Sequence, residues 1–274
     1  SSIEKAAMIS GIGSKNVRCI EVDDGFSMDV NSLKKQIKKD IGDGHIPFFV
    51  CATIGTTSST GIDPVKEIGR ICDQYDLWMH VDAAMAGTAS LCPEYQYIQK
   101  GLNYADSYLF NPHKWMLTNF DCSCLFIKNQ KALTSALEIM PEYLKTEYSK
   151  TDKVIDYRDW QIPLGRRFRA LKLWAVIRYY GTSGLQNYIR NHIELAQHFF
   201  SWVKNDSRFE IMAPATLNLV CFRVKGDDEL NEALLKYING SGNILMTHTK
   251  INNRYTIRFC VGQTHTNMSH IKLA

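Results

Sequence analysis

Lys114 stands in a short polar segment between two apolar runs, 108–110 and 122–127, that have the composition of buried strands. A neutral amine at a largely buried strand end is a nucleophile for a carbonyl carbon and can form a Schiff base. Asp82 directly follows a third apolar run, 77–81, and a carboxylate there can pair with a protonated pyridine nitrogen. Together the two residue types predict the protein half of a pyridoxal phosphate site.

Each of these residues also has a simpler explanation. Lys114 could be a surface lysine, Asp82 a helix cap, and the pair Thr56 and Thr57 turn residues. All of them nevertheless follow expected strands, and the carboxyl ends of parallel strands form one edge of a sheet, where ligands bind. The sequence has no Walker loop, no G-x-G-x-x-G after a strand and no G-x-S-x-G elbow to indicate another chemistry. Their joint position therefore favours the cofactor site.

The elements expected around this edge alternate between strands and helices. This βαβ rhythm predicts a mainly parallel sheet with helices on both faces. Asp29 or Asn31 could cap one helix, and Pro64 fits the first turn of the next, where a missing N–H costs nothing. The expected strands are 16–22, 46–53, 77–84, 106–111 and 122–127, and the expected helical segments are 29–41, 63–76 and 97–105.

The C-terminal part of the sequence predicts a second, smaller lobe. A long helical periodicity over 168–206 is interrupted at 181–184 by two glycines. Strands at 217–224, 244–251 and 255–261 and a helix at 227–240 follow it. We therefore expect a large cofactor-binding domain over 1–177 and a small α/β domain over 178–274.

Composition limits the classes of protein. The chain has 274 residues, 45% of them hydrophobic and 22% charged, which is ordinary for a soluble globular protein. Its net charge is +4, and the charged cluster at 34–40 fits the solvated face of a helix better than a nucleic-acid site. No run of about 18 apolar residues occurs, so we expect no membrane span. Nucleic acid and membrane are therefore not expected as partners.

The cysteines predict no metal site and no disulfide framework. Most of the eight cysteines lie in apolar runs, where a free thiol behaves as a small hydrophobic side chain. The close pair Cys122 and Cys124 lacks the second pair of ligands that a zinc site would need. A reducing, cytoplasmic location is the expectation that follows.

Four longer motifs carry a resemblance to a known family. "HVDAAMAG", "NPHKWMLTNFDCS", "PEYLK" and "DWQIPLGRRFRALKLW" resemble the group II pyridoxal-phosphate-dependent decarboxylases, above all the aromatic L-amino-acid decarboxylases of the plant tyrosine and tryptophan branch. That branch also holds the aromatic aldehyde synthases. The resemblance implies the α/β architecture of fold type I, which is aspartate-aminotransferase-like. It also implies pyridoxal 5'-phosphate as cofactor and a homodimer with shared active sites.

The resemblance implies a role for particular residues. Lys114 matches the lysine that binds the cofactor covalently, and Asp82 matches the carboxylate at the pyridine nitrogen. His113 matches a histidine close to substrate and cofactor. The other cofactor-binding positions that match are Thr57 near the ring's 3-oxygen, Ala84 against the ring, Asn111 on the phosphate side, and Leu164 and Gly165 from the neighbouring subunit.

A polar segment near 141–156 lacks a hydrophobic period and is expected to form a mobile catalytic loop. Its Tyr143 could simply anchor the loop. By resemblance, however, it matches the tyrosine that crosses to the partner's site and protonates the substrate α-carbon after carbon dioxide leaves. Aldehyde synthases typically have phenylalanine there, so Tyr143 favours decarboxylation to the amine. Tyr148 is a second candidate donor, although an exposed loop residue is the simpler interpretation.

Two departures from the family pattern affect these expectations. Met85 stands where the family normally has tyrosine, and the sequence begins at Ser1, just after the position of the family's ring-stacking histidine. The chain therefore resembles a fragment that lacks roughly the first third of a typical member. An inactive truncated homologue remains an alternative. Tyrosine or dopa is the favoured substrate, with tryptophan and phenylalanine open, because Gly165 discriminates only weakly among them.

Overall fold

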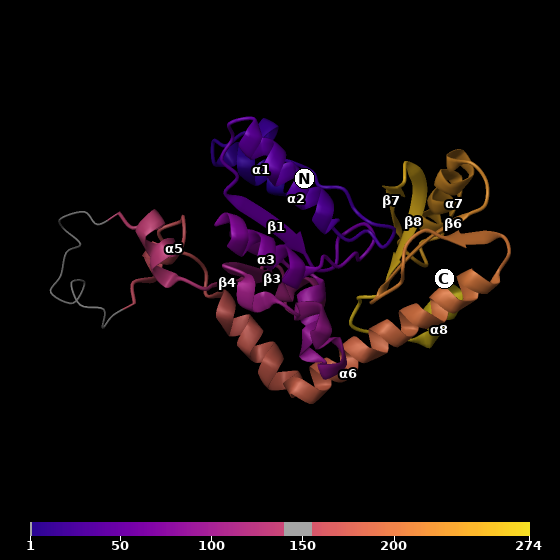
Figure 1. Cartoon of the computed structure of the whole chain (residues 1–274). Helices are drawn as coiled ribbons and strands as arrows, with labels where there is room; N and C mark the ends of the chain where they lie inside the picture. Colours follow the sequence, from indigo (N-terminus) through magenta and orange to yellow (C-terminus); the bar gives the residue numbers. More distant parts are fainter. Residues whose placement is uncertain (1, 140–154) are drawn as a thin grey trace.

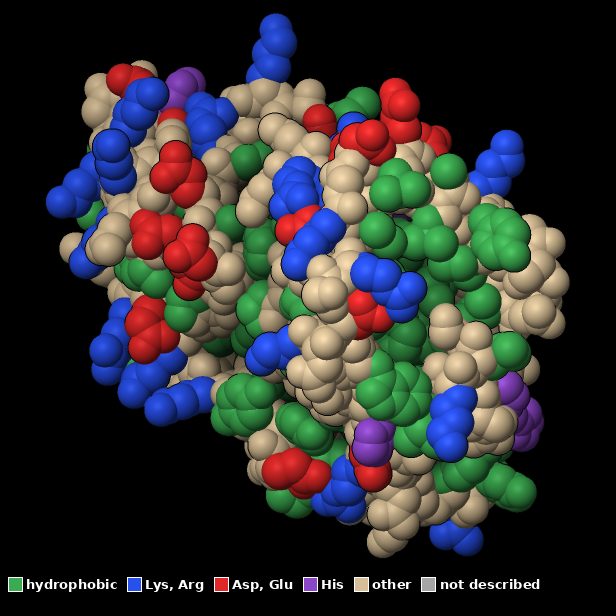
Figure 2. Space-filling model, turned by 90° about the vertical axis from the view of Figure 1, so that its right-hand side faces the viewer, with side chains coloured by type: hydrophobic (Ala, Val, Ile, Leu, Met, Phe, Trp, Pro, Cys, Tyr) green, Lys and Arg blue, Asp and Glu red, His purple; other side chains and the backbone are tan. Residues whose placement is uncertain are grey.

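The computed structural model describes residues 2–139 and 155–274. Figure 1 shows a sheet-containing body near the N-terminus and a second one near the C-terminus, with the long helix α6 (Arg169–Asn205) running beneath both. Figure 2 looks at the side that carries the second body, where charged side chains of both signs surround exposed apolar ones. The expected α/β architecture with two sheet-containing parts is confirmed.

The first sheet has the order β1-β2-β3-β4. Its first three strands are parallel, and β4 pairs with β3 in the antiparallel direction. The pairing register places Thr53 opposite Asp82 and Asp82 opposite Leu109, so the ends of three strands are level with one another. The strands are β1 (Phe49–Thr53), β2 (Trp78–Asp82), β3 (Ser107–Phe110) and β4 (Cys124–Ile127).

Two amphipathic helices precede strands of this sheet as expected. Helix α2 (Val30–Gly42) begins after Asp29, whose carboxylate accepts a hydrogen bond from the backbone N–H of Ser32. Of the two caps considered, Asp29 is therefore the one used. Helix α3 (Val65–Tyr75) follows Pro64 and buries its apolar face against β1 and β2.

Two expected elements differ from the structure. Residues 16–22 form no strand, because among the described residues only an isolated bridge from Val22 to Met28 gives this segment a pairing partner. The expected helical connection over 97–105 consists of 3-10 turns rather than α-helix. Short turns and helices complete the first body: α1 (Ser2–Ile9), η1 (Ser14–Asn16), η2 (Ala86–Leu91), η3 (Pro93–Gln99), η4 (Leu102–Tyr104), α4 (Pro112–Trp115), α5 (Gln130–Leu137) and η6 (Tyr157–Trp160).

The second sheet is antiparallel and has the order β5-β6-β8-β7. Helix α7 (Asp228–Gly240) packs against β6 and β8, and α8 (Met268–Leu273) lies against α6. The strands are β5 (Phe209–Ile211), β6 (Leu219–Val224), β7 (Thr247–Ile251) and β8 (Arg254–Cys260). The expected small α/β unit thus has one additional short strand, β5.

Helix α6 joins the two bodies through their cores. Its backbone leaves helical geometry at Gly181, with φ 63° and ψ 176°, inside the interruption that the two glycines predict. Beyond this kink, Ile189 and Ile193 belong to the core under the first sheet. Leu195 and Ala196, directly after them, belong to the core of the second sheet. The domain division near residue 177 stays a proposal, and it falls just before this kink.

Candidate active site

The carboxyl edge of the parallel strands brings several of the expected site residues together. Asp82 ends β2, and its carboxylate accepts a hydrogen bond from the backbone N–H of Ala84 at 3.0 Å. The carbonyl of Ala84 in turn accepts a bond from the backbone N–H of Asn111, directly after β3, at 2.9 Å. Asp82, Ala84 and Asn111 are therefore neighbours at one edge.

Lys114 lies on the single turn α4 that follows β3. Its backbone N–H donates to the carbonyl of Asn111 at 2.9 Å, which holds the turn close to the strand end. Its side chain is exposed. We expected a largely buried lysine, and this expectation is wrong, because no described residue covers the side chain of Lys114.

His113 is fixed by the chain that leads into β4. Its Nδ1 lies within hydrogen-bond distance of both the carbonyl oxygen of Cys122, at 2.6 Å, and the backbone N–H of Cys122, at 3.0 Å. Its ring meets the ring of Phe120 edge-on, with centroids 4.9 Å apart. The half-buried imidazole is thus held beside Lys114, and none of the described residues forms a hydrogen bond with its other nitrogen, Nε2.

The turn after β1 contributes Thr57, which is exposed. Gly55 before it has φ +80°, and a Cβ atom there would lie 2.5 Å from the Cβ of Ala86, so this close approach requires glycine. The carbonyl of Thr57 accepts a hydrogen bond from Nη2 of Arg258 at 2.5 Å. Arg258 lies on β8, so the second sheet holds the turn that carries Thr57.

Sequence reasoning missed Arg258 as a residue at this edge. Its Nη1 donates to the hydroxyl of Thr247, and its buried Nε has no hydrogen-bond partner within the described part of the chain. The signal was present in the sequence, because an arginine inside the apolar strand "YTIRFCV" demands an explanation that burial alone does not give.

A second missed group is Asp121, in the segment between α4 and β4. Arg169 donates to one of its oxygens at 3.0 Å and Arg167 to the other at 2.5 Å. The hydrogen bond from Arg169 is the main reason that the pKa of Asp121 falls to about 2. These bonds connect the segment after Lys114 to the start of α6.

Other expected residues lie elsewhere or outside the described residues. Leu164 is 80% exposed, and a Cβ atom on Gly165 would meet no described atom within 4 Å. Within the described chain these two residues touch none of the edge residues, and their expected contact with a neighbouring subunit stays a prediction. Tyr143 and Tyr148 lie outside the described residues.

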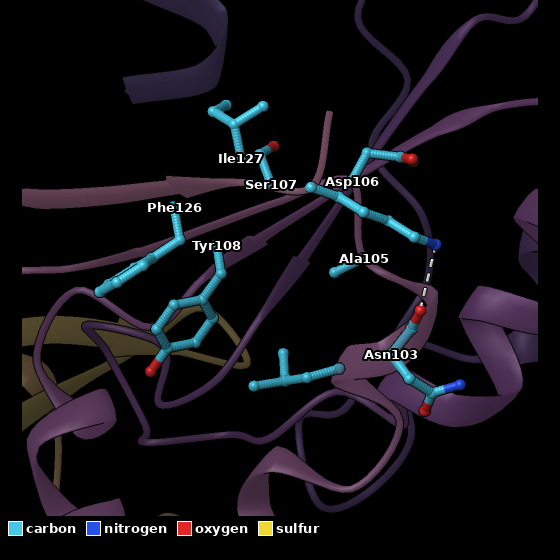
Figure 3. A pocket seen from close by; sticks show the side chains of 9 residues that line it. Asn103, Ala105, Asp106, Ser107, Tyr108, Phe126 and Ile127 are labelled. Atoms are coloured by element: carbon cyan, nitrogen blue, oxygen red, sulfur yellow. Dashed lines mark hydrogen bonds between the residues drawn. The ribbon is translucent and has the colours of Figure 1, made fainter. Parts of the chain in front are cut away.

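One pocket of the described chain lies at the opposite edge of the first sheet. Its volume is about 320 Å³, and it is lined by residues at the start of β3 and the end of β4 (Figure 3). The polar groups around it are paired within the chain, since Lys128 donates to the carbonyl of Asn103 and Gln99 donates to the hydroxyl of Tyr108. This pocket is therefore separate from the carboxyl edge with Asp82 and Lys114.

Comparison with known proteins identifies the family. Residues 1–225 match the pyridoxal-dependent decarboxylase conserved domain. The chain belongs to the pyridoxal-dependent decarboxylase family. The predicted resemblance, which rested on four motifs, is thereby confirmed.

Individual members of the family are similar over the whole chain. It is 48% identical to tyrosine decarboxylase 2 of Narcissus pseudonarcissus and 46% identical to phenylacetaldehyde synthase of Petunia hybrida. It covers 56% and 57% of these relatives, so it spans little more than half of their length. The crystal structure of Oryza sativa TDC with PLP and tryptamine superimposes with a TM-score of 0.96 at 37% identity, covering all of this chain and 58% of that one. This match confirms fold type I.

The residues at the carboxyl edge fit pyridoxal phosphate, the cofactor of this decarboxylase family. The side-chain Oδ1 of Asn111 is buried and has no hydrogen-bond partner in the described residues. Because the two ends of an amide are assigned rather than observed, this position can also offer an N–H to an anion. An amine, a carboxylate and an unpaired amide at one edge are the groups that an aldehyde, a pyridine nitrogen and a phosphate require.

The described residues give no second kind of site. Across 2–139 and 155–274, no group of three or more His, Cys, Asp or Glu side chains could hold a metal ion. None of the helices described is both long and apolar enough to pass through a bilayer. Met85, where the family normally has tyrosine, is half-buried and packs against the core of the first sheet.

Proposed function

We propose that this decarboxylase-family chain forms the lysine-bearing part of an enzyme that removes carbon dioxide from an aromatic L-amino acid and releases the arylalkylamine. The observation that carries the proposal is the common edge of Asp82, Asn111 and Lys114, set up by the register of β2 and β3. Support for aromatic substrates comes from the relatives, which include a tyrosine decarboxylase. Tyrosine or dopa is our favoured substrate, with tryptophan and phenylalanine as alternatives.

In this proposal the chain's own residues bind, orient and move protons. Bound pyridoxal phosphate supplies an electron-withdrawing ring that takes up the electron pair left behind by the departing carboxylate. Lys114 would hold the cofactor covalently and would release the product, and Asp82 would keep a proton on the pyridine nitrogen. Asn111 holds the phosphate side, and Ala84 leaves room for the ring. His113 presents Nε2 to the substrate.

Four further residues have assigned roles beside Asp82, Asn111 and Lys114. Thr57 contacts the ring's 3-oxygen, and its turn is held in place by Arg258. Tyr143 donates the proton that replaces carbon dioxide on the α-carbon, and closure of its loop excludes water. Leu164 and Gly165 reach the phosphate of a second copy of the chain.

A homodimer follows from this last assignment. Several large apolar side chains before the α6 kink are exposed, among them Phe168, Leu171 and Trp174, which is 60% exposed. Several large apolar side chains exposed on one short segment are typical of a protein–protein interface. Sedimentation equilibrium of the holoenzyme would give twice the chain mass if the proposal is right.

The central test is Lys114→Ala. The variant should lose decarboxylation and covalent cofactor together, because no other group at the edge offers an amine. After borohydride reduction, mass spectrometry should find the cofactor mass on the peptide that contains Lys114 in the wild type only. Lys100→Ala, at another exposed lysine, is the matched control and should retain both properties. Turnover by Lys114→Ala would overturn the assignment.

Asp82→Asn tests the electronic role separately. A neutral amide no longer favours a protonated pyridine nitrogen, so kcat should fall about 10²–10³-fold while some cofactor stays bound. Stopped-flow rates at saturating cofactor give the comparison. A near wild-type rate would remove Asp82 from the mechanism.

The similarity to phenylacetaldehyde synthase makes oxidative deamination a second candidate. In that reaction the amino acid, molecular oxygen and water give aldehyde, carbon dioxide, ammonia and hydrogen peroxide. Peroxide equal in amount to carbon dioxide would favour it, whereas amine equal to carbon dioxide favours the decarboxylase. Tyr143→Phe should raise the peroxide yield if this residue is the proton donor.

A further inference from the structure

Trp115, the residue directly after Lys114, makes one buried polar contact. Its side chain is 2% exposed, and its indole N–H donates to Nδ1 of His192 at 3.1 Å. Indole nitrogen can only donate a hydrogen bond, so Nδ1 must be the unprotonated nitrogen of the imidazole. His192 itself is completely buried in the second half of α6.

The other nitrogen of His192 reaches the chain after β8. Nε2 lies 3.1 Å from the carbonyl of Gln263, which can only accept, so Nε2 carries the proton. Only the neutral imidazole with this one tautomer satisfies both partners. Burial also lowers the pKa of His192, against a smaller opposing effect of the bond to Gln263.

The preceding turn of α6 also contacts the segment that follows β8. The ring of Tyr188, four positions before His192, lies 4.1 Å from the imidazole between centroids. Its hydroxyl donates to the carbonyl of Gly262 at 3.2 Å. One face of α6 therefore forms hydrogen bonds with the carbonyls of two consecutive residues, 262 and 263. His192, on this face, also accepts the bond from Trp115.

The turn that carries Lys114 depends on such outside support. Helix α4 has only four residues, and a helix this short is not stable without tertiary contacts. The indole of Trp115 is its buried anchor in the core of the first sheet. The direction of the Lys114 side chain is thus set by where the indole ring of the next residue is held.

We propose that His192 is a positioning residue that fixes the Lys114 turn through Trp115 and couples it to segment 262–263. This inference rests on the proposed function for the role of Lys114. A displacement of about 1 Å in a reacting group can cost 10²-fold in rate, so loss of the link should lower kcat. KM should change less, because Lys114 acts in the chemical steps and His113 is the one assigned substrate contact on this turn.

The test compares two replacements of His192 in the holoenzyme. His192→Leu removes both bonds, whereas His192→Gln keeps an acceptor and a donor on one side chain. His192→Leu should lower kcat about 10-fold to 100-fold and speed release of bound cofactor, while His192→Gln should recover most of both. Trp115→Phe removes the indole N–H together with part of the buried ring, and it should resemble His192→Leu. It serves as the second variant if the leucine protein does not fold.

The matched control is His198→Leu on the same helix, where the side chain is half exposed. It should leave kcat and cofactor release unchanged. Wild-type values in both His192→Leu and Trp115→Phe would overturn the inference. Equal damage in His192→Leu and His192→Gln would overturn it too, since only packing would then matter.

Cofactor release and the visible absorbance of the bound cofactor are measured independently of turnover. They keep the two proposals distinguishable. A wild-type protein that binds cofactor at Lys114 without decarboxylating any aromatic amino acid would refute the proposed function alone. In that case the release rates of the His192 and Trp115 variants would still decide the role of His192.

Discussion

The two halves of α6 both carry large apolar side chains, but their surroundings are opposite. Up to the kink at Gly181, none of its residues is buried against the described chain, although Trp174 and Ile177 are large and apolar. Beyond the kink, eight residues are buried, and they fill parts of both cores. Apolar periodicity therefore reports that a helix face needs a partner, but not whether the same chain supplies it.

The sharpest test of this difference is a pair of truncations. Ile189→Ala, at a position 1% exposed, should lower the free energy of unfolding by about 2–5 kcal/mol at any protein concentration. Ile177→Ala should cost less, and its cost should grow with dimer population if a second copy covers the first half. Urea unfolding at several protein concentrations measures both. Equal, concentration-independent losses would show that the two halves are packed alike.

The kink between the halves can be tested with its two glycines. Gly181 has φ 63° and ψ 176°, a conformation essentially restricted to glycine, so Gly181→Ala should cost about 1–3 kcal/mol. Gly184→Ala is the matched control, because a Cβ atom there would meet only Tyr180 at an ordinary 3.4 Å. It should be neutral or stabilise the helix by up to about 1 kcal/mol. If the two variants had the same melting temperature, the kink would not depend on glycine.

The smallest expected effect on stability concerns two ion pairs, one on each half of α6. Glu94 pairs with Arg190 on the second half, and this hydrogen bond lowers the pKa of Glu94 from 4.5 to about 2. Asp121 pairs with Arg169 at the first half and has a pKa of about 2. At a pH between the folded and the unfolded pKa values, each carboxylate is ionised in the folded chain but protonated in the unfolded chain. Their stabilisation is present above about pH 4.5 and is lost as the pH falls through 2.

Glu94→Gln and Asp121→Asn should each flatten the acid side of the stability curve slightly, since exposed pairs contribute little. Thermal unfolding between pH 2 and pH 6 measures this slope. A steep acid dependence that persisted in both variants would assign it to other carboxylates.

Local patterns predicted the elements whose partners are close in sequence. Helix α2 was predicted over 29–41 and found over 30–42, because its cap, Asp29, and its apolar face are local features. The segment 16–22 has strand composition, but a strand needs a neighbour, and its Val22 reaches only an isolated bridge. A residue-by-residue pattern carries no information about such neighbours.

The candidate site shows the same limit. Asp82, Asn111 and Lys114 were predicted at one edge, because each follows a strand of a parallel sheet. The exposure of Lys114 was not predicted, because it depends on what covers the edge rather than on the segment itself. The bonds of His192 to Trp115 and Gln263 and of Arg258 to Thr57 were not predicted either. These partners lie 71 to 201 positions away.

These distant contacts bear on how the chain acquires its structure during synthesis. The bonds from Trp115 to His192 and from His192 to Gln263 close loops of 77 and 71 positions. A chain is synthesised from its N-terminus at about 5–20 residues per second, and closing long loops slows folding. The turn that bears Lys114 therefore emerges from the ribosome before His192 and Gln263, and it obtains its final support only after Gln263 has followed.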